Sequence, residues 1–348
     1  MSREMTAAAT ETETRTDNRT DNGTKTATPT WPRTGAGTGI TGAGRHGRRV
    51  VVAALLAPAL LATAAPAANA REAARPGGVQ HQLDVLVERD GAPGTLAYVN
   101  SRTYTAGTAQ AGTGRPAVDA DARFRLAGDT KAFTAAAVMG LVADGKVRLD
   151  SPARRYVPQL GENPVTVREL LKQRSGLPEY TGLIDWSGGP YTDEDHLALA
   201  LAADQDFEPG ADWGYSNTNY LVLGLLINNT SGENHRDHIE RTVLGPLGLK
   251  DTYWPARGEP TPRGMSGPSG GLVSTQKDLN AFWAGLFEGR LLPGWAVRQM
   301  TNDTTDVGGR DVYPRGSRYG YGVASIPLSG LRGTVDAALC AGRKGVSQ

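Results

Sequence analysis

A short stretch in the first half of the chain joins an extended entry to an alanine-rich helix with an early lysine. Residues 124–137 read FRLAGDTKAFTAAA, and the small side chains at the end suit a helix that is packed on all sides. Lys131 falls in the opening turn of this predicted helix. Because a charged amine is costly to bury without a partner, the stretch predicts both a central buried helix and a functional site at its start.

The first 70 residues are predicted to lie outside the folded domain. Residues 1–45 are rich in Thr, Gly, Asp and Arg with almost no large apolar side chains, so we expect them to be disordered. Residues 46–70 have the order of a secretory signal peptide: a basic group, an apolar run too short to cross a bilayer, and a small-x-small cleavage site ending at Ala70. A membrane anchor is the alternative, and Arg48 with Arg49 also fits a twin-arginine signal. A true start further along would explain the long leader.

Charge and cysteine content exclude other classes of protein. The 348 residues carry 37 Lys and Arg against 36 Asp and Glu, which leaves no basic footprint for nucleic acid. We therefore expect no nucleic-acid partner, and membrane contact only through the export signal. The single cysteine, Cys340, can form no internal disulfide, so the fold must be stable without one.

The remaining part, residues 71–348, is interpreted as one domain in which strands are followed by many helices and a returning strand. This order predicts an α+β or α/β fold with helices inserted into an antiparallel sheet. Helices are predicted over 78–88, 131–144, 167–173, 197–202, 220–227, 239–247, 277–287 and 296–300, and strands over 95–100, 102–110 and 319–325.

Two of these helices have clear start signals. Thr166 with Glu169 three residues later predicts a capping box. Thr275 with Asp278 predicts a second capped start. The S-x-x-K-like match that runs from Ser274 to Lys277 is therefore better explained as a helix cap than as a catalytic pair.

Several further matches have structural explanations. The acidic run 193–195 favours a helix start rather than a metal site. His235 and His238 have metal-like spacing without a third convincing ligand, so we interpret them as part of a surface helix. The glycine-rich match at 37–42 lies in the leader with no preceding strand, and the nucleophile-elbow match at 267–271 has no later histidine to serve it.

Three polar residues remain as a candidate site. Lys131 opens one helix, and Tyr215 and Asn217 stand two apart on a predicted loop between helices, from which both can face a cleft. In a lysine-activated serine hydrolase, an oxygen nucleophile at the start of a helix attacks the substrate and a lysine at i+3 handles its proton. A tyrosine can share that proton, and an asparagine can bind the substrate amide.

The sequence resembles the serine β-lactamase and penicillin-binding family, specifically the branch of class C β-lactamases and secreted D-alanyl-D-alanine carboxypeptidases. The resemblance spans about residues 78–328 and rests on segments in the family's order. They are the surround of Lys131, ELLKQRSGLPEY at 169–180, FEPG at 207–210 leading to YSNTNY at 215–220, PLGLKDT at 246–252 and GGLVST at 270–275. It implies a β-lactamase/transpeptidase-like α+β fold, with an antiparallel sheet flanked by helices and an inserted, mostly helical region.

The resemblance also implies an activity, which is hydrolysis of D-Ala-D-Ala peptides, β-lactams or esters through an acyl-enzyme, without a metal or organic cofactor. Lys131 would be the proton-handling lysine, Tyr215 the second proton shuttle and Asn217 the amide-side substrate contact. The nucleophilic serine would fall on Gly128, which has no side chain. Loss of a nucleophile forfeits about 10⁶ in rate. We therefore expect an impaired hydrolase, with a non-catalytic binder of cell-wall peptide or β-lactam as the alternative.

A second departure lies near the C-terminus. The family's third motif should follow the strand at 319–325, and the nearest match is LRGTV at 331–335, with leucine where a His or Lys belongs. Arg332 is a weak candidate contact for a substrate carboxylate, and a stray arginine in an altered tail is the alternative. We expect that the C-terminal strands are missing or altered, that the domain is truncated, and that the protein is a secreted monomer.

Overall fold

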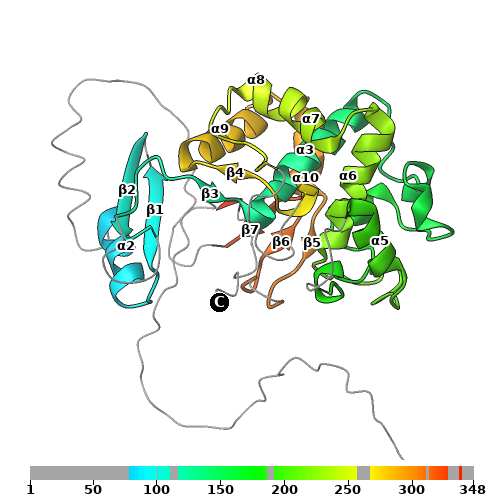
Figure 1. Cartoon of the computed structure of the whole chain (residues 1–348), viewed down its shortest axis with the longest axis horizontal. Coiled ribbons are helices and arrows are strands. Elements are labelled where there is room, and N and C mark those ends of the chain that lie inside the picture. The colour runs from blue at the N-terminus through cyan, green and yellow to red at the C-terminus, as the bar shows by residue number, and fades with distance from the viewer. Residues whose placement is uncertain are drawn as a thin grey trace, which may run out of the picture. The chain divides into compact units, whose positions relative to one another are not determined.

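The computed structural model (Figure 1) describes residues 78–99, 101–109, 117–185, 192–256, 267–310, 313–327 and the backbone of 337–338. The chain divides after Arg49, and all described residues belong to the second unit, Val50–Gln348. The predicted leader (1–45), the predicted signal peptide (46–70), Arg332 and Cys340 lie outside the described residues. Within these limits, no helix has the length and apolar character needed to cross a membrane.

All the predicted helices are present. The helices are α2 (Val79–Glu88), α3 (Thr130–Ala143), α4 (Val167–Leu171), α5 (Asp193–Leu201), α6 (Asn217–Ser231), α7 (His235–Ile239), α8 (Gly245–Leu247), α9 (Gln276–Phe287) and α10 (Gly294–Asn302). The strands are β1 (Gly94–Val99), β2 (Arg102–Gly107), β3 (Phe124–Arg125), β4 (Val273–Ser274), β5 (Thr305–Asp306), β6 (Arg318–Tyr319), β7 (Ala324–Ile326) and β8 (Ala337–Ala338). A π-helical segment, Glu240–Leu244, joins α7 to α8.

The helix starts follow the local sequence signals. At α4 the predicted capping box forms, since Thr166 and Glu169 exchange side-chain and backbone hydrogen bonds. At α9 the Thr275 hydroxyl accepts from the Asp278 N–H at 3.3 Å. The acidic run opens α5, where Asp195 completes a second capping box. These short-range signals place the helix ends because each satisfies backbone N–H groups that have no partner within the helix.

The strands form small antiparallel sheets, so the fold is α+β as predicted. Among the described residues the orders are β1–β2, β3–β4 and β5–β6–β7–β8. The predicted hairpin is confirmed, with Gly94 opposite Gly107 and Val99 opposite Arg102. The side chain of Asn280 on α9 donates to the carbonyl of Tyr98, which ties this hairpin to the helical part.

The prediction of one strand over 319–325 is wrong. The chain forms β6, turns, and returns as β7, with Tyr319 opposite Ala324. Gly322 has φ +70° in this turn, a conformation that other residues rarely adopt. A Cβ added there would lie 2.8 Å from the Lys131 carbonyl oxygen, so glycine also lets the turn approach α3. The alternation of small and aromatic residues resembles a strand pattern and conceals this turn.

The core is built around α3 and α6, which lie against each other (Figure 1). Every side chain from Thr130 to Met139 and from Thr218 to Ile227 is buried. Phe133 on α3 stacks on Phe282 of α9, with ring centroids 3.7 Å apart. Each large apolar side chain buried here contributes about 1.5–3 kcal/mol. The core therefore fixes the two helix ends that carry the predicted site.

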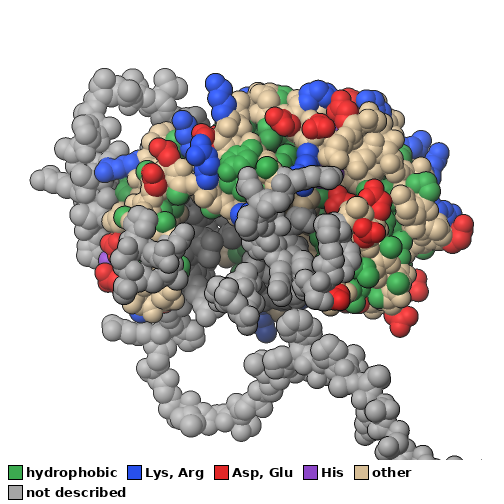
Figure 2. Space-filling view, in the orientation of Figure 1, with side chains coloured by type: hydrophobic (Ala, Val, Ile, Leu, Met, Phe, Trp, Pro, Cys, Tyr) green, Lys and Arg blue, Asp and Glu red, His purple; other side chains and the backbone are tan. Residues whose placement is uncertain are grey.

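The described surface in Figure 2 carries Lys and Arg side chains interspersed with Asp and Glu. This arrangement agrees with the nearly balanced charge of the chain. The described part of that face shows no large patch of basic side chains of the kind that would attract a polyanion.

Candidate active site

The first turn of α3 brings Lys131 into the centre of the molecule. Strand β3 runs into the 3-10 turn Ala127–Asp129 and then into the helix. The Leu126 N–H donates to the Leu272 carbonyl at 2.8 Å, which fixes this entry. Lys131 is only 1% exposed, so its amine requires partners within the fold.

Oxygen acceptors and aromatic rings surround the Lys131 amine. Its Nζ donates to Asn217 Oδ1 at 2.7 Å and to the Ser269 carbonyl at 2.7 Å. It also lies 4.7 Å from the centroid of the Tyr215 ring and 5.5 Å from that of Tyr220. Carbonyl oxygens and ring faces all stabilise a cation. These contacts therefore offset part of the cost of burying the Lys131 amine.

Asn217 reaches Lys131 from the start of α6. The prediction that Asn217 lies on an extended loop is wrong, because it is the first residue of the helix. Ser216 is the N-cap, and its hydroxyl accepts from the Thr218 N–H at 3.2 Å. This cap starts the helix three residues earlier than the apolar pattern indicates. The half-buried Tyr215 precedes the cap, and its ring faces Lys131.

The turn at 173–178 holds the start of α6 and the residues just before it in place. This role was not predicted from the sequence. Gln173 is fully buried, and its Oε1 accepts from the Ser216 N–H at 3.0 Å and from Asn219 Nδ2 at 2.5 Å. Its own carbonyl accepts from the Gly214 N–H at 3.0 Å. A polar residue between an apolar helix and a glycine-containing break is the only signal that could have suggested this role.

The short turn Gly267–Ser269 supplies the second acceptor for Lys131. The Thr134 hydroxyl on α3 donates to the Pro268 carbonyl at 2.8 Å. On the other side, a Cβ added at Gly224 of α6 would lie 2.4 Å from Pro268 Cγ, so only glycine allows this contact. In sequence, this segment matches a nucleophile elbow that no later histidine serves. Its contribution is a backbone carbonyl, which side-chain patterns do not report.

Gly128 lies one turn before Lys131, at the place predicted for the nucleophile. It is buried within the 3-10 turn and has no side chain to acylate. The nearby hydroxyls on α3 are engaged with a different segment: that of Thr130 accepts from the Leu272 N–H at 3.2 Å, and that of Thr134 donates to Pro268. The structure thus brings Lys131, Tyr215 and Asn217 together beside a position that lacks a hydroxyl. Arg332 lies outside the described residues.

An ion-pair cluster supports the site from α4 and the β6–β7 turn. Asp303 accepts from Arg168, Lys172 and the Tyr321 hydroxyl, at 2.5, 2.6 and 2.5 Å. Burial acts to raise the pKa of Asp303, but these hydrogen bonds outweigh it and lower the pKa to about 2. Burial and the bond to Asp303 raise the pKa of Tyr321 well above its usual range. Tyr321 is therefore a neutral structural donor that anchors the turn carrying Gly322.

The histidines of α7 are not on the surface, which corrects the prediction. His235 is 2% exposed and His238 is 4% exposed. The ring of His235 lies edge-on to Trp254, and its Nδ1 is 3.9 Å from Asp193 Oδ2. Burial, with a smaller effect of Arg236, lowers the pKa of His235 to about 4. No group of three potential metal ligands occurs among the described residues.

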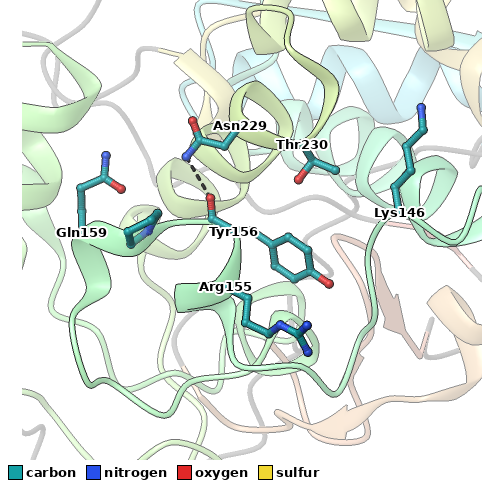
Figure 3. A pocket seen from close by; sticks show the side chains of 7 residues that line it. Lys146, Arg155, Tyr156, Gln159, Asn229 and Thr230 are labelled. Carbon is teal, nitrogen blue, oxygen red and sulfur yellow. Dashed lines mark hydrogen bonds between the residues drawn. The ribbon is translucent and has the colours of Figure 1, made fainter.

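A shallow cavity of about 850 Å³ lies elsewhere (Figure 3). Lys146, Arg155, Tyr156, Asn229 and Thr230 are among its lining residues. Asn229 and Thr230 lie at the C-terminal end of α6, and Lys146 follows α3, so the cavity is about 20 Å from Lys131 along these helices. Cations there complement the negative ends of the helix dipoles, which explains them without a ligand.

The chain is similar to known proteins in sequence and in structure. Residues 71–338 match the family model Beta-lactamase. Protein flp of Staphylococcus aureus (strain MW2) is 28% identical over 188 residues, 50% of this chain and 38% of the relative. Penicillin-binding protein 4* of Bacillus subtilis (strain 168) is 29% identical over 181 residues, 50% of this chain and 39% of the relative. The matched region is thus about two fifths of the length of these curated relatives.

Two solved structures are also similar. A D-stereospecific amidohydrolase from Streptomyces sp. has a TM-score of 0.61 at 30% identity, covering 72% of this chain and 83% of that one. The D-amino acid amidase from Ochrobactrum anthropi SV3, complexed with L-phenylalanine amide, has a TM-score of 0.62 at 29% identity, covering 72% and 80%. The family match extends over most of the chain and includes both helices that meet at Lys131. The chain therefore belongs to the β-lactamase family.

Proposed function

We propose that this protein is an exported hydrolase-family member whose site at Lys131 receives D-Ala-D-Ala peptides, β-lactams or small esters, with turnover impaired at Gly128. The observation that carries the proposal is the contact between Lys131 and Asn217 one turn beyond a residue without a side chain. Export rests on the signal-like order of residues 46–70, with the folded domain beginning at residue 71 and acting as a monomer.

The chemistry explains why Gly128 matters. In acyl transfer through a serine, the hydroxyl oxygen forms a bond to the substrate carbonyl while the lysine takes the hydroxyl proton. The start of a helix favours the oxyanion that develops on the carbonyl oxygen. At Gly128 there is no oxygen to form that bond and no proton for Lys131 to accept. The covalent step is therefore lost, while the groups that bind the substrate remain.

The names of the relatives support the range of proposed substrates. The solved structures include a D-stereospecific amidohydrolase and a D-amino acid amidase, and the curated relatives include a penicillin-binding protein. Amides of D-amino acids, D-Ala-D-Ala peptides and β-lactams share an amide carbonyl, which the Asn217 side chain and the start of α3 can contact. This shared group is the expected point of recognition.

A second candidate is a non-catalytic binding protein. The contacts of the Lys131 amine favour it, because oxygen acceptors and aromatic rings stabilise the ammonium form. An ammonium cannot take a proton, but it attracts a carbonyl or carboxylate oxygen. A protein of this kind would bind its ligands without hydrolysing them.

A fluorescent penicillin tests these proposals. We expect no covalent label on the native chain after denaturing electrophoresis, and a label on Gly128→Ser, with Gly128→Ala as the control for an added side chain. A covalent label on the native chain would contradict impaired turnover. If Gly128→Ser folds but is not labelled, the missing serine is not the only cause of inactivity. Fluorescence anisotropy of the native chain tests binding: saturable reversible binding is expected, and its absence would overturn the binding-protein reading.

A further inference from the structure

Glu179 connects the turn at 173–178 to the start of α6. Its carboxylate accepts two backbone N–H groups: Oε2 accepts from the Asn217 N–H at 2.7 Å, and Oε1 accepts from the Thr181 N–H at 3.0 Å. The two residues joined by this carboxylate are 38 positions apart in the sequence. No sequence motif or family comparison assigns a role to this glutamate.

The place of this carboxylate is favourable. The first N–H groups of a helix lack partners within the helix, and the positive end of the helix dipole attracts an anion. In α6, the Ser216 hydroxyl accepts from Thr218, and Glu179 accepts from Asn217. The helix start is therefore occupied by a protein carboxylate.

Asn217 is held at both of its ends. Its backbone N–H is bound by Glu179, and its side-chain oxygen is bound by the Lys131 amine at 2.7 Å. A backbone fixed at this point directs the amide toward Lys131. Without Glu179, the first residue of α6 would lose one of these two restraints, and the amide could rotate away from the amine.

We propose that Glu179 is a positioning residue that keeps Asn217 Oδ1 against the Lys131 amine. The proposal deepens the function proposed above, because it concerns the same site, but its main test requires no substrate. A purely structural cap would affect folding without changing the environment of Lys131. A positioning role predicts that Lys131 changes when Glu179 does.

The test is a pH titration of lysine labelled with ¹³C at Cε in the native chain, followed by NMR. The Lys131 signal is assigned by its loss in Lys131→Arg. Gln at position 179 keeps one acceptor oxygen for two N–H donors, so in Glu179→Gln we expect the titration midpoint of Lys131 to fall by about one unit. The midpoint falls because an Asn217 amide that has rotated away no longer accepts from the Lys131 amine, and this loss disfavours the ammonium form. Asp206→Asn is the matched control, because it removes a negative charge close to Glu179 but no contact to Asn217. Only a small shift of the Lys131 midpoint is expected in this variant.

A double-mutant comparison separates positioning from a direct charge effect. In an Asn217→Ala background, Glu179→Gln should shift Lys131 no further, because Asn217 carries the effect. An equal shift with and without Asn217 would overturn the proposal, as would an unchanged midpoint in folded Glu179→Gln. If Glu179→Gln does not fold, Glu179→Asp replaces it, with a smaller shift expected because the shorter side chain reaches less well; an unchanged midpoint there would likewise overturn the proposal.

The same variants can be examined where the nucleophile is restored. Relative to Gly128→Ser, Gly128→Ser/Glu179→Gln should react with fluorescent penicillin about tenfold more slowly, because Asn217 is no longer held where it contacts the substrate amide. Gly128→Ser/Asp206→Asn should react at a similar rate to Gly128→Ser. If Gly128→Ser itself is not labelled, the proposed function fails at that step. The titration of Lys131 still decides the role of Glu179, so the two failures are distinguishable.

Discussion

Lys131 and Asn217 are 86 positions apart in the sequence, yet the Lys131 amine and the Asn217 side-chain oxygen lie 2.7 Å apart. The contact joins the first turns of two buried helices that pack against each other. The contact that builds the site is therefore present although Gly128 has no side chain to act as a nucleophile.

Substitutions of Tyr215 should distinguish the contribution of its aromatic ring from that of its hydroxyl. Tyr215→Phe keeps the aromatic face 4.7 Å from the Lys131 amine, so penicillin affinity of the native chain should change little. In the Gly128→Ser background, the same change should slow covalent labelling by about 10²-fold or more, because the proposed proton shuttle is lost. Tyr215→Leu should weaken both, since it also removes a cation–π contact of about 0.5–2 kcal/mol. Anisotropy and labelling rates measure the two effects, and equal behaviour of Phe and Leu would contradict this division.

Gly224→Ala should destabilise the protein by about 1–3 kcal/mol, because its Cβ would lie 2.4 Å from Pro268 Cγ. The shifted turn should also move the Ser269 carbonyl away from Lys131. Gly140→Ala is the matched control in α3, where the nearest atom outside the helix backbone to an added Cβ is Leu292 Cδ2 at 4.0 Å. There we expect stabilisation of about 0.5–1 kcal/mol. Urea denaturation measures both, and a neutral Gly224→Ala would show that Pro268 can move freely.

Acid should weaken the cluster around Asp303. The pKa of Asp303 is about 2 in the folded protein, below the value of 3.8 for an unperturbed aspartate. The unfolded chain therefore binds the proton first as the pH falls. The contribution is complete above about pH 5 and is lost as the pH falls toward 2, by about 2 kcal/mol. Denaturation between pH 2 and 6 should show a flatter profile for Asp303→Asn than for the native chain, with the exposed Asp237→Asn as the control for loss of one carboxylate.

His235 should make the protein less stable between about pH 6.5 and pH 4. Its pKa is lowered from 6.5 to about 4 by burial, so the unfolded chain is protonated first and gains stability in this range. Burial raises the pKa of Asp193 to about 6, which acts in the opposite direction. The Asp193 side chain is still 26% exposed, so we expect its contribution to be the smaller one. In His235→Gln, the free energy of unfolding should fall less on acidification through this range, although the buried His196 and His238 and the Asp303 cluster still respond to pH. An unchanged profile would contradict the assignment.

The sequence predicted the local elements well. Caps such as Thr166 and Thr275 and the apolar periodicity of α3 and α9 act within a few residues, so they can be read from the chain. The prediction was wrong where a glycine turn resembled a strand, at Gly322, and where a cap extended a helix, at Ser216. It was also wrong on His235 and His238, because the exposure of a short helix depends on what packs against it.

By itself, the sequence determined that a lysine opens a buried helix, that Tyr215 and Asn217 stand two apart, and that glycine occupies position 128. These are properties of residue type and spacing. Only the tertiary structure decided which groups meet the lysine: the Asn217 side chain, the Ser269 carbonyl and two aromatic rings. Such contacts join segments distant in sequence, and two of the groups that place them, a backbone carbonyl and a glycine at a close approach, have no side-chain signature.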